Sequence, residues 1–140
     1  MAKVIKRSKG VIILAIILLI GHLPFRSEAS AHDYALYFGN LSSFFLFVDL
    51  VSNVAGMTIA IGLFFLKDII RKAVVVLNVI LIPEAIMRSV IAYPRITNSI
   101  SGPEMLRHQA ITTYASVVTI GLCILYIYFF TRPKVKEQFK

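Results

Sequence analysis

Hydrophobic residues fall in four long runs along this chain, and short polar segments separate the runs. A helix needs about 20 mostly apolar residues to cross a membrane whose hydrocarbon core is about 30 Å thick, at about 1.5 Å per residue. Four stretches meet or nearly meet this length: residues 4–25, 41–66, 69–92 and 110–131. The pattern predicts an all-α fold, in which residues 1–140 form one transmembrane domain, an integral membrane four-helix bundle.

Two of the four runs have features that modify this picture. The first is the shortest, and it reaches spanning length only if its helix begins near Val4 and the basic side chains there extend to the lipid headgroups. The third contains Pro83, which removes one backbone donor, so we expect a kink at this point without an end to the helix. Pro133 follows the fourth run and should end it.

The composition agrees with a membrane protein. Apolar residues make up 58% of the chain and charged residues only 16%, and the mean hydropathy is +0.81. A soluble domain of this size needs more charge to cover its surface. Cys123 is the single cysteine, which excludes an internal disulfide and the thiol oxidoreductases that need paired cysteines.

The basic residues indicate how the helices cross the membrane, because such residues beside a span are retained in the cytoplasm. Most of them fall on one side of the predicted topology: Lys3, Lys6, Arg7, Lys9, Lys67, Arg71, Lys72, Arg132, Lys134, Lys136 and Lys140. Both termini are therefore expected to be cytoplasmic, in a multi-pass protein of the inner (plasma) membrane. The net charge of +8 then reflects topology and affinity for anionic lipid. No DNA-binding motif accompanies it, so we expect no nucleic-acid partner.

The first 31 residues also allow a second interpretation. A basic start, an apolar run and the sequence Ala29-Ser30-Ala31 resemble a secretory signal with its cleavage site. The stretch before that site is long and contains Pro24 and Arg26, which favours an uncleaved anchor. Cleavage would leave three spans with the amino terminus outside.

Polar residues inside the second and third runs are predicted to meet. A tight turn at Lys67-Asp68 makes the two helices antiparallel, so residues whose numbers sum to about 135 lie at similar depth. Glu84 and Arg88 are also four residues apart, the spacing at which opposite charges meet on a helix. The members of this expected polar cluster are Asp49, Glu84, Arg88, Asn53, Asn78 and, from the end of the first run, His22.

The cluster has two interpretations. In the first, Asp49 and Glu84 hold Arg88 and fix the register of the helix hairpin. In the second, two acids against one base leave an excess negative charge, which can hold a proton or admit a cation.

Small and hydroxyl-bearing residues recur at three- and four-residue steps on two of the predicted helices. Such faces let neighbouring helix backbones approach closely in lipid, and they are more typical of helix packing than of permeation. The two helix-packing faces consist of Ser52, Gly56 and Ala60 on the second run and of Thr112, Ser116, Thr119 and Cys123 on the fourth. Together they predict a closed bundle.

Motifs for catalysis or for a cofactor are absent from the sequence. The histidines His22, His32 and His108 lack the local spacing of a metal or haem site. There is no phosphate-binding loop, nucleophile elbow or HExxH. We expect no enzyme activity, no metal and no cofactor.

The segments between the spans are short. Residues 26–40 contain Tyr34 and Tyr37, so a short interfacial helix is expected there. The segment from Pro94 to Gln109 contains a Gly-Pro turn and is expected to be an ordered external loop.

The carboxyl end reads YIYFFTRPKVKEQF, from Tyr126 to Phe139. This segment resembles the ending T-R-P-x-V-K-x-x-F of small uncharacterised bacterial membrane proteins with about four spans. The resemblance covers about one tenth of the chain and implies the same topology and a bacterial origin, without an activity. Val135 and Phe139 are expected to lie along the membrane surface or to dock a cytoplasmic partner.

The sequence therefore predicts a small polytopic membrane protein that acts by helix packing, as an accessory or scaffolding subunit or as a homo-oligomer. Its partners would be the lipid bilayer and other membrane subunits or itself. The alternative is a small carrier or channel in which Asp49, Glu84 and Arg88 handle protons or cations. A third class, a lipid- or quinone-binding redox module, would be recognised by a cofactor absorption band.

Overall fold

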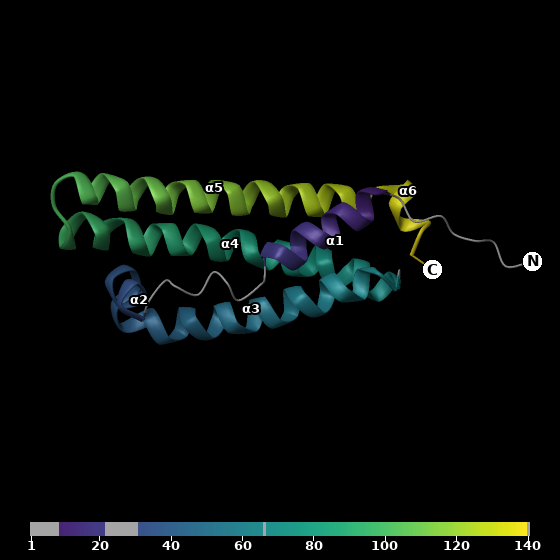
Figure 1. Ribbon diagram of the computed structural model, residues 1–140, viewed down its shortest axis with the longest axis horizontal. Coiled ribbons are helices and arrows are strands. Elements are labelled where there is room, and N and C mark those ends of the chain that lie inside the picture. Colours follow the sequence, from purple (N-terminus) through teal and green to yellow (C-terminus); the bar gives the residue numbers. More distant parts are fainter. Residues whose placement is uncertain (1–8, 22–30, 66, 140) are drawn as a thin grey trace, which may run out of the picture.

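The computed structural model describes residues 9–21, 31–65 and 67–139, and over these residues all regular structure is helical. This confirms the all-α prediction. The elements are α1 (Lys9–Gly21), α2 (Ala31–Phe38), the 3-10 helix η2 (Gly39–Leu41), α3 (Ser42–Leu63), α4 (Asp68–Ser99), α5 (Pro103–Thr131) and α6 (Pro133–Lys136), drawn in Figure 1.

Three of the helical stretches are long and apolar enough to cross a membrane. They are Ala35–Leu63 with 29 residues, Asp68–Ser99 with 32 and Pro103–Thr131 with 29. The long helices lie side by side, and α1 crosses them obliquely near the end where α4 begins and α5 ends (Figure 1). With 13 residues, α1 is about 20 Å long, shorter than a hydrocarbon core. The rest of the predicted span 4–25 lies outside the described residues.

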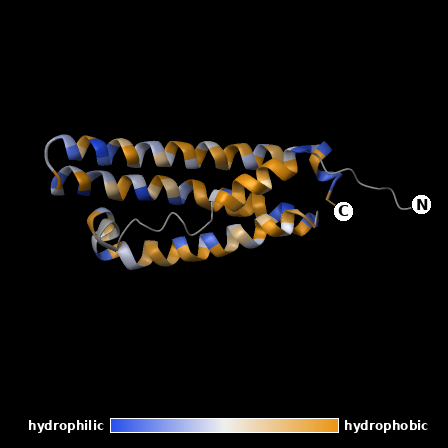
Figure 2. Cartoon of the chain, viewed as in Figure 1, coloured by the Kyte–Doolittle hydropathy of each residue, from blue (hydrophilic) through white to orange (hydrophobic). Residues whose placement is uncertain are grey.

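The apolar residues of the long helices mostly face outward. Fewer than one residue in five is buried in the most apolar stretch of each of them. Figure 2 shows hydrophobic residues along the length of the helices, with hydrophilic residues at their ends and in a few positions along α3 and α4. An exposed apolar belt of this kind requires lipid or another apolar surface around it, because in water it would be costly.

The prediction of an external loop from Pro94 to Gln109 is wrong. The helix α4 passes through Pro83, as predicted, and also through Pro94, and only residues 100–102 separate it from α5. Gly102 adopts a positive φ of 72°, which glycine tolerates, and Pro103 occupies the first turn of α5, where its missing N–H costs no helical hydrogen bond. A hydrogen bond joins the end of α4 to the start of α5: the Gln109 side chain donates to the Thr97 hydroxyl at 2.9 Å.

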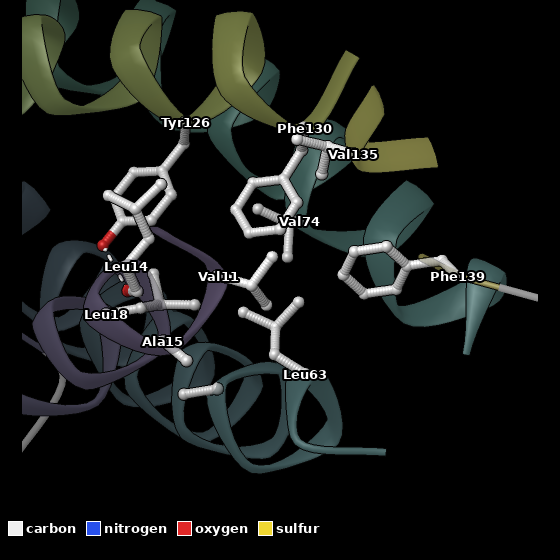
Figure 3. Packing of buried hydrophobic residues seen from close by; sticks show 11 residues of the cluster. Val11, Leu14, Ala15, Leu18, Leu63, Val74, Tyr126, Phe130, Val135 and Phe139 are labelled. Atoms are coloured by element: carbon white, nitrogen blue, oxygen red, sulfur yellow. Dashed lines mark hydrogen bonds between the residues drawn. The ribbon is translucent and has the colours of Figure 1, made fainter. Parts of the chain in front are cut away.

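A first apolar core lies near the start of α4 and the end of α5, where α1 packs against the long helices (Figure 3). Val11, Leu14, Ala15 and Leu18 of α1 are buried there. The Tyr126 hydroxyl of α5 donates to the Leu14 carbonyl at 2.9 Å. The remaining buried members of this core are Ala60, Leu63, Val74, Phe130, Val135 and Phe139.

The carboxyl-terminal segment is part of this core. Val135 and Phe139 are buried, and the Phe139 ring meets the Phe130 ring edge to face at 6.0 Å (Figure 3). The expectation that these two side chains lie along the membrane surface is therefore wrong. Pro133 ends α5 as predicted, but the turn that it begins folds the tail back onto the helices.

Arg71 joins the start of α4 to the end of α5. Its guanidinium is buried, donates to the Phe130 carbonyl at 3.1 Å and pairs with Asp68 at 2.6 Å. The last carbonyls of a helix lack partners within the helix and attract cations. Arg71 provides the hydrogen-bond donor for one of these carbonyls. The sequence predicts a second role for it, as one of the basic residues that keep this end of the helices in the cytoplasm.

A second apolar core lies at the opposite end, where α2 meets α3 and α4. Phe38, Phe45, Ala92 and Ile96 are buried in it. The short helix expected around Tyr34 and Tyr37 is present as α2. Between α2 and α3 the chain turns at Gly39, whose φ is 54° and on which an added Cβ would meet the Arg95 guanidinium, so both conformation and space favour glycine.

Candidate functional site

Arg88 of α4 binds two carboxylates at once, one from each helix of the hairpin. Its Nη2 lies 2.6 Å from Asp49 Oδ1 and its Nη1 lies 3.1 Å from Asp49 Oδ2, a bidentate arrangement between α4 and α3. Its Nε donates to Glu84 Oε1 on the same helix. We call Asp49, Glu84 and Arg88 the ion-pair cluster.

The hairpin geometry brings these three residues together. The connection between α3, which ends at Leu63, and α4, which begins at Asp68, is short, so the helices run antiparallel and equal distances from the turn meet. Glu84 precedes Arg88 by one helical turn, which places the carboxylate beside the guanidinium. The positions of these three residues in the sequence are thus sufficient to predict the ion-pair cluster.

Two aromatic rings cover the guanidinium on its side toward α2. The Arg88 Cζ atom lies 4.9 Å from the centroid of the Phe45 ring and 5.7 Å from that of the Phe38 ring. The rings themselves are 4.3 Å apart. Arg88 Nη2 also lies 3.5 Å from the Phe45 carbonyl oxygen. Cation–π attraction therefore adds to the ion pairs and links α2 to the hairpin.

The ion-pair cluster is partly shielded and holds two carboxyl groups against one guanidinium. The side chains of Arg88, Asp49 and Glu84 are 20%, 33% and 16% exposed. With both carboxylates ionised, one positive charge faces two negative charges. Charge-assisted hydrogen bonds to a guanidinium are about twice as strong as neutral ones. Chemically, the arrangement can fix helix register, or it can take up one further proton or cation.

The other predicted members of the polar cluster lie apart from Arg88 or outside the described residues. Asn78 is buried, and its amide donates to the Val74 carbonyl of its own helix at 2.8 Å. Asn53 is half-buried on α3, and within the described ranges no hydrogen bond joins it to Asn78. His22 lies outside the described residues.

The predicted helix-packing faces turn inward. On α3, Gly56 and Ala60 are buried and Ser52 is half-buried, and Ala60 belongs to the core around α1. On α5, Cys123 is buried, and Thr112, Ser116 and Thr119 are half-buried. The Ser116 hydroxyl is hydrogen-bonded to that of Ser89 on α4 at 2.5 Å. These faces hold the helices of this chain together.

A second polar contact, which the sequence did not indicate, joins α2 to α5. The Tyr37 hydroxyl and His108 Nδ1 are hydrogen-bonded at 2.5 Å, and the two rings meet edge to face at 5.8 Å. His108 Nε2 lies 3.9 Å from Glu104 Oε2. Tyr37 and His108 are 71 residues apart, and no spacing rule connects them.

The described part of the chain holds no group of three or more His, Cys, Asp and Glu residues close enough for a metal ion. A metal normally needs three or four such ligands. Over these residues, the polar groups of the site therefore interact with each other and with backbone carbonyls.

Comparison with family models, with curated proteins and with solved structures gives no match to this chain.

The substitution Arg88→Gln is expected to lower the free energy of unfolding by about 2 kcal/mol, because it leaves two carboxylates facing each other without their donor. Thermal unfolding followed by circular dichroism in mild detergent measures the change. Arg107→Gln is the matched control: Arg107 is 71% exposed and lies 3.7 Å from Glu104, so its loss should change stability by less than about 0.5 kcal/mol. Equal effects of the two substitutions would contradict a structural role for the ion-pair cluster.

Proposed function

We propose that the chain is a multi-pass protein of the bacterial inner membrane, with both termini in the cytoplasm and a fourth span that α1 begins. The proposal is supported by the distribution of charge. The start of α1, the α3–α4 turn, the start of α4, the end of α5 and α6 gather at one end of the helices (Figure 1). These segments and the residues next to them carry Lys9, Lys67, Arg71, Lys72, Arg132, Lys134 and Lys136. Basic residues beside spans stay in the cytoplasm. The ending that resembles bacterial four-span proteins supports the same topology.

Single cysteines introduced after Cys123→Ser would test this topology. In intact cells, a membrane-impermeant maleimide should label Ser101→Cys, because the α4–α5 turn is then outside. Lys67→Cys, Lys136→Cys and Lys3→Cys should react only after permeabilisation. Loss of the Lys3→Cys thiol from the mature protein would indicate cleavage after Ala31, and labelling of Lys67→Cys in intact cells would contradict the orientation.

Within the membrane, we propose that the protein acts by helix packing, as an accessory or scaffolding subunit or as a homo-oligomer, and that it catalyses no reaction. The observation that supports this most directly is the outer face of α5. Gly121 lies on this face, with nothing within 4 Å of the position of an added Cβ. Exposed residues surround it at helical spacing: Tyr114, Val117, Leu125 and Tyr128. A glycine on such a face allows the backbone of another helix to approach.

Gly121→Leu should weaken association with this partner helix on the order of tenfold, or about 1.4 kcal/mol, because the new side chain fills the space at the glycine. Size and mass analysis in mild detergent measures the complex. Val117→Leu is the control on the same face, since it keeps a bulky side chain there. A strict monomer without a co-purifying protein, or a complex indifferent to Gly121→Leu, would count against this function.

A second candidate is a small carrier or channel for protons or cations. The specific observation in its favour is the excess carboxylate of the ion-pair cluster, since Arg88 neutralises only one of Asp49 and Glu84. Ionisable groups within a span are costly, and in transporters they mark ion pathways.

Liposomes containing the purified protein should then show a proton or cation flux above that of empty liposomes. Asp49→Asn and Glu84→Gln would each reduce this flux about tenfold or more, because each removes a charge that attracts the ion. Glu104→Gln, which changes an exposed acid outside the ion-pair cluster, should leave it unchanged. A wild-type flux no greater than that of empty liposomes would exclude transport.

A further inference from the structure

We propose that the basic end of the molecule binds the headgroups of anionic phospholipids. This inference rests on the proposed membrane location. The surface concerned, which we call the basic surface, consists of Lys9, Lys67, Lys72, Arg132, Lys134 and Lys136. These residues come from the start of α1, the start of α4, the end of α5 and α6, which gather at one end of the helices (Figure 1).

Most of the cations on the basic surface lack an acidic partner. Lys72 pairs with Asp68 at 2.8 Å, and Asp68 is also bound by the buried Arg71. In the part of the chain that the structure describes, four exposed lysines take part in no ion pair: Lys9, Lys67, Lys134 and Lys136. Their positive charge is therefore available to a phosphate group from outside the protein.

Apolar side chains stand next to these cations at the same end of the helices. Phe65 and Ile69 flank the α3–α4 turn and are 70% and 69% exposed. Just after α5, the Arg132 guanidinium lies 4.8 Å from the Tyr128 ring centroid and donates to the Tyr128 hydroxyl at 3.0 Å. Apolar groups beside cations match the two parts of a phospholipid, the acyl chains and the phosphate.

Burial of the tail fixes two of the lysines in place. Lys134 and Lys136 flank Val135 on α6, and Val135 and Phe139 are held in the apolar core. Because Val135 points inward, both lysines are directed away from the core and are exposed. A cation on an anchored turn loses less conformational entropy on binding than one on a free tail.

The location of the basic surface favours lipid over a soluble polyanion. It lies at the ends of helices whose apolar faces need lipid around them, at the depth where headgroups begin. Among the described residues of the opposite end, Arg95 and Arg107 are matched in number by Asp33 and Glu104. Over the described part of the chain, the excess of positive charge thus lies at one end, as recognition of one leaflet requires.

Native mass spectrometry of the full chain, with phosphatidylglycerol and phosphatidylcholine of the same acyl chains at equal concentration, tests the proposal. The wild type should retain phosphatidylglycerol preferentially. Lys67→Gln, Lys134→Gln and Lys136→Gln should each reduce this preference about fivefold, and high salt should weaken it. Arg107→Gln, which removes one exposed cation from the opposite end, should leave it unchanged. Circular dichroism checks that every variant is folded.

Every other outcome would overturn the lipid site, its ligand or the membrane location. Equal retention of the two lipids by the wild type, or equal effects of Arg107→Gln and the lysine substitutions, would overturn the proposal. Displacement of phosphatidylglycerol by a short RNA at physiological salt would assign the surface to nucleic acid instead. Extraction of the protein from membranes by alkaline carbonate would refute the membrane location, whereas a carbonate-resistant protein without lipid preference would refute only the lipid site.

Discussion

The structure depends most on the pairing of Arg88 with Asp49 and Glu84. A lone guanidinium among apolar helices would be costly, because lipid offers it no hydrogen-bond acceptor. Asp49 supplies two acceptors from α3, so the pairing fixes the register of the hairpin as well as satisfying the charge. The same guanidinium faces Phe38 and Phe45, which extends the constraint to α2. One residue thus positions three helical elements.

Polar contacts also hold the other helices. Tyr126 bonds to the Leu14 carbonyl, Arg71 to the Phe130 carbonyl, and Ser89 to Ser116. Among the described residues, every buried side-chain nitrogen and oxygen has a hydrogen-bond partner. Association of helices in lipid lacks the hydrophobic driving force available in water, so close packing and such hydrogen bonds provide it. The inward position of Gly56, Ala60 and Ser116 follows from this requirement.

The sequence predicted the parts of the structure that depend on local spacing. Antiparallel numbering placed Asp49 level with Glu84 and Arg88, and the four-residue step placed Glu84 beside Arg88. The helices beyond Pro94 were missed because their polar residues resemble those of a loop, although contacts between α4 and α5 order them. The Tyr37–His108 contact and the burial of Phe139 in the core around α1 depend on residues that are far apart in the sequence and come together in the fold. No periodicity in the sequence encodes such contacts.

The position of the ion-pair cluster bears on the choice between packing and transport. Along α4 it lies between Val74, in one apolar core, and Ala92, in the other. An apolar core thus lies to each side of the ion-pair cluster along α4, and apolar packing opposes a charge by several kcal/mol. A packing role requires no ion to enter these cores. On physical grounds, the excess carboxylate is more simply explained as the second carboxylate that Arg88 binds in lipid than as a site on an ion pathway.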